Sequence, residues 1–81
     1  MMQNLAIALN YNEFRLLTRK DNIDYTYCFD SESIKGEQNC ALFLIGRWWL
    51  KNWDWSWVFE YCKEHGIVVV DKDDAQEYKW I

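Results

Sequence analysis

Residues 40–59 read CALFLIGRWWLKNWDWSWVF, and the rest of the chain can be organised around them. They hold five of the six tryptophans and only three charged residues, Arg47, Lys51 and Asp54. On a helix these charges fall at i, i+4 and i+7, so they form one narrow polar stripe on an otherwise apolar surface. The pattern predicts a core helix that is opened by Gly36 or Asn39 and closed near residues 52–54.

The three charges also leave this run well short of the roughly 20 apolar residues that span a bilayer, so no membrane anchor is expected. A second helix should follow at once, with Asp54 or Ser56 as its N-cap, and run to Glu64. Gly66 then ends it, because glycine suits the left-handed conformation just beyond a helix end.

Three segments upstream show the period-2 alternation of strands, and we expect strands at about 4–10, 13–19 and 23–30. The short polar segments between them, around residues 10–12 and 20–22, favour tight turns and hence an antiparallel meander. A competing interpretation makes residues 2–18 one helix. The polar segment 31–36 is expected to be a loop.

Beyond Gly66, the branched run Ile67–Val70 is typical of a strand buried on both faces. It should enter the sheet interior or pair with the first strand, whereas residues 75–81 are expected to form a last short strand or a helical turn. The predicted fold is therefore α+β: one domain over residues 1–81, with a small antiparallel sheet (a three-stranded meander plus a C-terminal strand) covered on one face by two consecutive helices.

The composition limits the classes of function that this chain is expected to have. The chain has 81 residues, 15 of them aromatic, and a net charge of −4, with the acid concentrated on either side of the tryptophan run. A nonspecific nucleic-acid binder gains affinity by replacing phosphate counterions with Lys and Arg, so this balance argues against one and favours a partner with a basic surface. The odd number of cysteines and the absence of a signal-peptide pattern favour a reduced, cytoplasmic setting.

Two metal sites are conceivable, although neither is preferred and no cofactor is expected. Three thiols and one imidazole are an accepted zinc set, offered here by Cys28, Cys40, Cys62 and His65, but zinc ligands usually come in close pairs and these do not. The carboxylates after residue 70 could hold Mg²⁺ or Ca²⁺, yet they lack the pattern of a calcium loop. Catalytic motifs are absent from the sequence, and an enzyme is not expected.

The aromatic excess makes protein binding the leading functional interpretation, because Trp, Tyr and Arg dominate interface energetics. We expect a non-enzymatic module that resembles, in character and not in sequence, the small acidic inhibitors of phages and mobile elements, including anti-CRISPR proteins, and that would act in the host cytoplasm if phage-encoded. Its carboxylates would stand in for phosphates in a basic channel of a nucleic-acid-handling complex. The predicted partner-binding residues are Asp24, Asp30, Glu32, Arg47, Trp48, Trp53, Trp55, Asp71, Asp73, Asp74 and Glu77.

Three alternatives stay open. The first is a structural subunit whose tryptophans make a homodimer, and the second is a small module stabilised by zinc. The third is stacking of single-stranded bases on the tryptophan rings, which the acidic blocks on both sides make less attractive.

Overall fold

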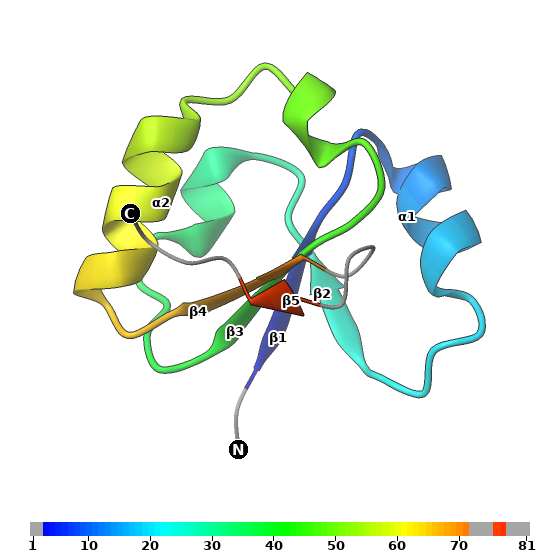
Figure 1. Cartoon of the computed structure of the whole chain (residues 1–81), viewed down its shortest axis with the longest axis horizontal. Coiled ribbons are helices and arrows are strands. Elements are labelled where there is room, and N and C mark those ends of the chain that lie inside the picture. The colour runs from blue at the N-terminus through cyan, green and yellow to red at the C-terminus, as the bar shows by residue number, and fades with distance from the viewer. Residues whose placement is uncertain (1–2, 72–75, 78–81) are drawn as a thin grey trace.

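A mostly parallel sheet runs through the centre of the molecule (Figure 1). The structure, a computed structural model, describes residues 3–71 and 76–77. In chain order the elements are β1 (Asn4–Ile7), α1 (Tyr11–Thr18), β2 (Tyr25–Tyr27), the 3-10 turn η1 (Ser31–Ile34), β3 (Ala41–Leu44), the 3-10 turn η2 (Trp48–Leu50), α2 (Trp55–Glu64), β4 (Val68–Asp71) and β5 (Gln76–Glu77).

The strand order across the sheet is β2-β1-β3-β4-β5. β1 pairs in parallel with β2 and with β3, and β3 pairs in parallel with β4. Only β5 is antiparallel, and it lies against β4. Helices and strands do coexist as predicted, but the antiparallel meander is wrong, because the chain crosses over between strands through helical segments instead of turning back in hairpins.

The segment predicted as a second strand, residues 13–19, is instead the helix α1. Asn10 begins it: the backbone there is extended, and the side-chain oxygen accepts a hydrogen bond from the Glu13 amide at 2.8 Å. Phe14 is the one buried residue of the helix. The competing helix over residues 2–18 is also wrong, since β1 occupies its first part.

Residues 40–52, all of them described, do not form the predicted core helix. Residues 41–44 form the strand β3 instead. Leu42 and Leu44 are buried on one side of the sheet, whereas Phe43 and Ile45 pack on the other side. A strand buried on both faces is continuously apolar, and in a short run that composition cannot be told from a buried helix. Gly46, with φ of +60°, turns the chain out of the strand.

Two other predictions are confirmed. α2 runs from Trp55 to Glu64, and the Asp54 side chain caps it by accepting from the Trp57 amide at 3.2 Å. Gly66 follows with φ of +68°, as expected just beyond a helix end. The branched run after it forms β4 (Val68–Asp71) in the interior of the sheet, paired with β3 and not with β1, but Val68 is 41 % exposed, so the expected burial on both faces is wrong.

The helical segments cover opposite faces of the sheet, so the prediction of two helices on one face is wrong (Figure 1). Leu5 and Ile7 of β1 face the larger apolar cluster, which includes Ile34 of η1 and Val58 of α2. Ala6 of β1 and Ala8 just beyond it face Phe14 of α1. Right-handed crossovers account for this arrangement. α1 connects β1 to β2 on one side of β1, whereas η1 connects β2 back past β1 to β3 and therefore covers the other face of the sheet.

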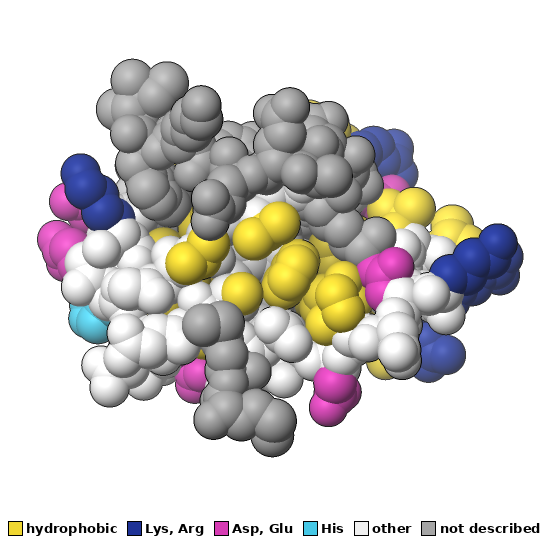
Figure 2. Space-filling view, turned by 60° about the horizontal axis from the view of Figure 1, so that its bottom comes forward, with side chains coloured by type: hydrophobic (Ala, Val, Ile, Leu, Met, Phe, Trp, Pro, Cys, Tyr) yellow, Lys and Arg dark blue, Asp and Glu magenta, His cyan; other side chains and the backbone are white. Residues whose placement is uncertain are grey.

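No helix among residues 3–71 and 76–77 combines the length and apolar character that a membrane span requires. Figure 2 shows hydrophobic side chains gathered at the centre of one face of the molecule. Lys and Arg side chains gather at its right-hand end, on the side where Figure 1 draws α1.

Candidate protein-binding surface

The four parallel strands end at the same edge of the sheet, which we call the carboxyl edge. In open sheets with helices on both faces, ligands bind at this edge where the strand order reverses, which here is between β1 and β3. Residues 8–13 follow β1, residues 28–30 follow β2, and residues 45–54 follow β3. These three segments form the candidate site.

The side chain of Lys51, from the loop after β3, reaches the end of β1. Its Nζ atom donates to the backbone carbonyl oxygens of Ala8 and Leu9, at 3.0 and 3.4 Å. It also donates to the Tyr27 hydroxyl at 3.1 Å. The half-buried ammonium therefore has its donors engaged by the protein itself, at the place where related topologies bind a ligand.

An ion pair ties α1 to the loop after β3. The Arg47 Nε and Nη2 atoms donate to Glu13 Oε1 at 3.1 and 2.9 Å, and the Arg47 backbone amide donates to Glu13 Oε2 at 3.0 Å. These hydrogen bonds, led by the one from the backbone amide, hold the pKa of Glu13 below its usual value. Arg47, predicted to contact a partner, thus also holds the loop in place.

The two neighbouring tryptophans of η2 have opposite roles. Trp48 is only 7 % exposed and packs edge-on against Trp55, with ring centroids 4.9 Å apart. Trp49 is 55 % exposed, and so is Leu50 next to it. Trp48 therefore belongs to the core. Trp49 and Leu50 form an exposed apolar pair, and neither residue is among the predicted partner-binding residues.

Trp53 and Trp55, both predicted to bind a partner, are half-buried. Their rings stack with centroids 5.4 Å apart, and Trp55 Nε1 donates to the Lys51 carbonyl oxygen at 3.2 Å. The Lys51 Nζ atom lies 5.4 Å from the centroid of Trp53, within the range of a cation–π contact.

The ring contacts continue across the whole edge. Phe29 meets Tyr11 and Tyr27, at centroid distances of 5.8 and 4.8 Å. Lys51 connects Tyr27 to Trp53, because its Nζ atom contacts both side chains. The ring centroids of Trp48 and Trp49 are 5.9 Å apart. We call this set the aromatic belt: Tyr11, Tyr27, Phe29, Trp48, Trp49, Trp53 and Trp55, with Lys51 at its centre.

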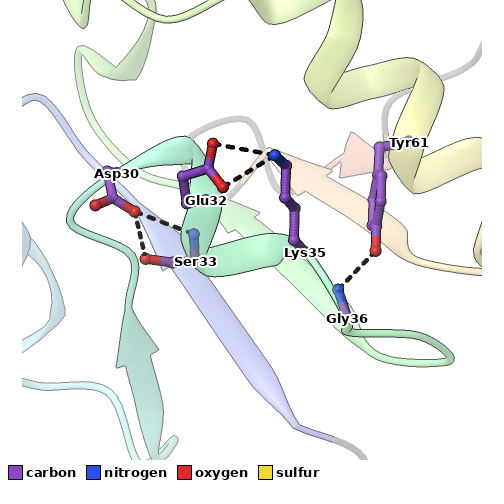
Figure 3. A network of polar contacts seen from close by, with 6 residues as sticks. All are labelled: Asp30, Glu32, Ser33, Lys35, Gly36 and Tyr61. Carbon is purple, nitrogen blue, oxygen red and sulfur yellow. Dashed lines mark hydrogen bonds and ion pairs between the residues drawn. The ribbon is translucent and has the colours of Figure 1, made fainter.

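The predicted acidic residues do not form one patch. Asp24 precedes β2 and so lies at the opposite edge from Asp30 and Asp71, which follow β2 and end β4. Figure 3 shows how two of them are engaged: Asp30 Oδ1 accepts from the Ser33 amide and hydroxyl, and Glu32 forms an ion pair with Lys35. Asp73 and Asp74 lie outside the described residues.

Glu77 belongs to β5, where its backbone is opposite Val70, and its side chain is outside the description. The predicted strand over residues 23–30 is too long: β2 ends at Tyr27, and Phe29 beyond it is 68 % exposed. The signal for this end was Asp30, whose side chain caps η1 immediately afterwards.

The three cysteines come together in one apolar cluster, all of them buried. Burial raises the pKa of the Cys28 thiol to about 11 and that of Cys62 to about 12. His65 instead stacks on Tyr61, with its Nδ1 atom 2.9 Å from the Tyr61 carbonyl oxygen. Within the described part of the chain, no three such side chains are placed to hold a metal ion.

Comparison of this chain with protein-family models, with curated proteins and with solved structures finds no match. The function is therefore inferred from the carboxyl edge. That edge offers exposed rings on a backbone held by fixed hydrogen bonds, and exposed aromatic rings are common at protein interfaces.

Proposed function

We propose that this chain is a non-enzymatic protein-binding module and that Trp49 and Leu50 anchor the partner. The observation that carries the proposal is that these two adjacent apolar side chains are each 55 % exposed, on a turn at the carboxyl edge. A tryptophan that enters a partner's pocket removes a large apolar area from water, and such residues dominate measured interface energies.

The turn that carries the pair is held from both ends. On one side Arg47 is bonded to Glu13, and on the other Lys51 is bonded to the end of β1. Between them Trp48 is anchored in the core. A surface that is already ordered before binding loses less conformational entropy in the complex, which favours affinity.

The charge of the edge favours a partner with basic groups around its apolar pocket. The three segments of the site, residues 8–13, 28–30 and 45–54, carry three carboxylates and two cations, so the site is slightly acidic, like the chain as a whole. Opposite charge steers encounter and selects among partners more than it adds affinity. The narrower hypothesis, an inhibitor of a nucleic-acid-handling defence complex, stays a prediction.

Lys51 supports contact with a protein over binding of a small molecule. Small-molecule sites are concave, and in this topology the expected place is the carboxyl edge between β1 and β3, where the Lys51 ammonium is already bonded to the end of β1. The exposed apolar groups instead project from the edge, where only a partner with its own pocket can enclose them.

The test is affinity capture from a bacterial lysate with three tagged forms: the natural chain, the double variant Trp49→Ala with Leu50→Ala, and a control. The control is Leu16→Ala, which truncates a side chain that is 62 % exposed on α1. We expect specific proteins that bind the natural chain and the control, are lost with the double variant, and bind less at high salt.

Equal capture by all three forms would contradict the role of Trp49 and Leu50. Each form is first checked by circular dichroism, because both variants change only exposed side chains and should fold normally.

A further inference from the structure

The strand ends around Lys51 surround its ammonium group as a binding site surrounds a ligand. The Nζ atom donates to the carbonyl oxygens of Ala8 and Leu9 at 3.0 and 3.4 Å, and to the Tyr27 hydroxyl at 3.1 Å. The ring centroid of Trp53 lies 5.4 Å from the same atom. The contacting groups come from the residue at the end of β2, the residues after β1 and the loop after β3, so the tertiary fold brings them together.

The oxygens of this site are neutral, and the two carbonyls depend on Lys51. No Asp or Glu of the described chain forms an ion pair with the Lys51 ammonium. Within residues 3–71 and 76–77, the carbonyl oxygens of Ala8 and Leu9 accept no hydrogen bond from any other group, and Ala8 is fully buried. Because a buried carbonyl without a donor costs free energy, the site needs a donor at this place.

The geometry selects a primary ammonium group as that donor. Such a group has three N–H donors, and the site offers three oxygen acceptors. The distances to these oxygens are those of N–H···O hydrogen bonds, whereas Mg²⁺ and Ca²⁺ hold oxygen at about 2.0–2.6 Å. The ring of Trp53 adds attraction for a positive charge.

We propose that these groups form a binding site for primary alkylammonium ions, in which Lys51 is the tethered ligand of the natural chain. Replacing Lys51 with Ala deletes Cγ, Cδ, Cε and Nζ, which together correspond to n-propylammonium. That free ion can therefore restore every contact of the deleted ammonium. The proposal does not depend on partner binding by Trp49 and Leu50.

The tether explains why the natural chain should ignore the free ion. A ligand held by a short covalent connection has an effective concentration in the millimolar range or above. An added alkylammonium ion has to compete with it for the same three oxygens. The response to the ion should thus appear only when the Lys51 side chain is removed.

The experiment is thermal unfolding of the full-length Lys51→Ala variant during titration with n-propylammonium chloride. We expect the midpoint to rise by at least about 3 °C at about 100 mM, relative to sodium chloride at the same concentration, because a ligand bound only by the folded state stabilises it. The natural chain should respond equally to the two salts.

Three other additives separate the ammonium from its parts. 1-Propanol has the same apolar stem without the charge, tetramethylammonium has the charge without N–H donors, and potassium is a bare cation. None of them should reproduce the rise in the midpoint. The Lys51→Met variant is the matched control, because its side chain occupies the space of the propyl group and should prevent the response.

Two measurements locate the bound ion. The backbone amides of Leu9 and Asn10 adjoin the two carbonyls, so their NMR signals in Lys51→Ala should shift as n-propylammonium is added. Adding Tyr27→Phe to Lys51→Ala removes one oxygen acceptor and should raise the dissociation constant at least about threefold.

An equal response to sodium chloride, 1-propanol or potassium would overturn the proposal, and so would amide shifts that are confined to other parts of the chain. If Lys51→Ala is unfolded on its own, circular dichroism follows the same titration as recovery of the folded chain. A variant that stays unfolded at the highest concentration of n-propylammonium would then overturn it.

Discussion

The Nζ atom of Lys51 lies 3.1 Å from the hydroxyl oxygen of Tyr27, which joins the loop after β3 to the edge strand β2. Through the carbonyls of Ala8 and Leu9 the same ammonium reaches the end of β1. One side chain thus connects the ends of three strands and both halves of the aromatic belt.

Replacing Lys51 with Met should keep the apolar stem and remove the ammonium. The carbonyl oxygens of Ala8 and Leu9 would lose this donor, so we expect the free energy of unfolding to fall by about 1–3 kcal/mol. Urea denaturation measures the change. Lys20→Met, at an exposed position, should stay within about 0.5 kcal/mol of the natural chain, and equal losses for the two variants would show that the Lys51 bonds contribute nothing.

Glu13 should make stability depend on acid pH. Its pKa is lowered in the folded chain by the hydrogen bonds from Arg47, so its stabilising effect is present above the ordinary value of 4.5 and is lost as pH falls below it. Glu13→Gln should therefore be less stable than the natural chain at pH 7, by about 1 kcal/mol. Denaturation at a series of pH values should show that difference shrinking toward pH 3, whereas a constant difference would contradict the assignment.

Gly46 and Gly36 form a matched pair for substitution by Ala. Both have positive φ, +60° and +87°, so each Ala carries a backbone penalty of about 1–2 kcal/mol. At Gly46 the new Cβ would also lie 2.6 Å from Leu17 Cδ1 and 2.9 Å from Glu13 Oε2, whereas at Gly36 nothing lies within 4 Å. Gly46→Ala should thus lower the thermal midpoint clearly more than Gly36→Ala, and similar shifts would argue against close packing of α1 on this loop.

Cys62 should make stability depend on alkaline pH. Burial raises its pKa from 9.0 to about 12, so the unfolded thiol releases its proton at lower pH than the folded one. Stability from this group is complete below pH 9 and falls between about pH 9 and 12, by roughly 1.4 kcal/mol per pH unit. Cys62→Ala removes this contribution, so its stability curve should approach that of the natural chain as pH rises. Parallel curves would contradict the prediction.

The C-terminal half of the helical prediction was accurate because its signals are local. Asp54 as N-cap and Gly66 beyond the helix end define α2 through contacts within a few residues. The β-branched run after Gly66 likewise favours a strand, and it forms β4.

The site was less predictable, for a reason seen in Trp48 and Trp49. Adjacent identical residues carry the same local signal, yet one is buried and the other is exposed, because Gly46 redirects the chain out of β3. Residue type indicated an aromatic interface, but it could not indicate which rings face outward.

By itself, the sequence determined the apolar segments, the cap of α2, the strand β4 and the acidic balance, because these follow from residue type and short-range spacing. Only the tertiary structure decided that Ala41–Leu44 is a strand, that the sheet is parallel, and that Tyr11, Phe29, Trp49 and Leu50 are exposed along one edge. Strand pairing joins residues far apart in the chain, and the exposed surface is whatever that pairing leaves uncovered.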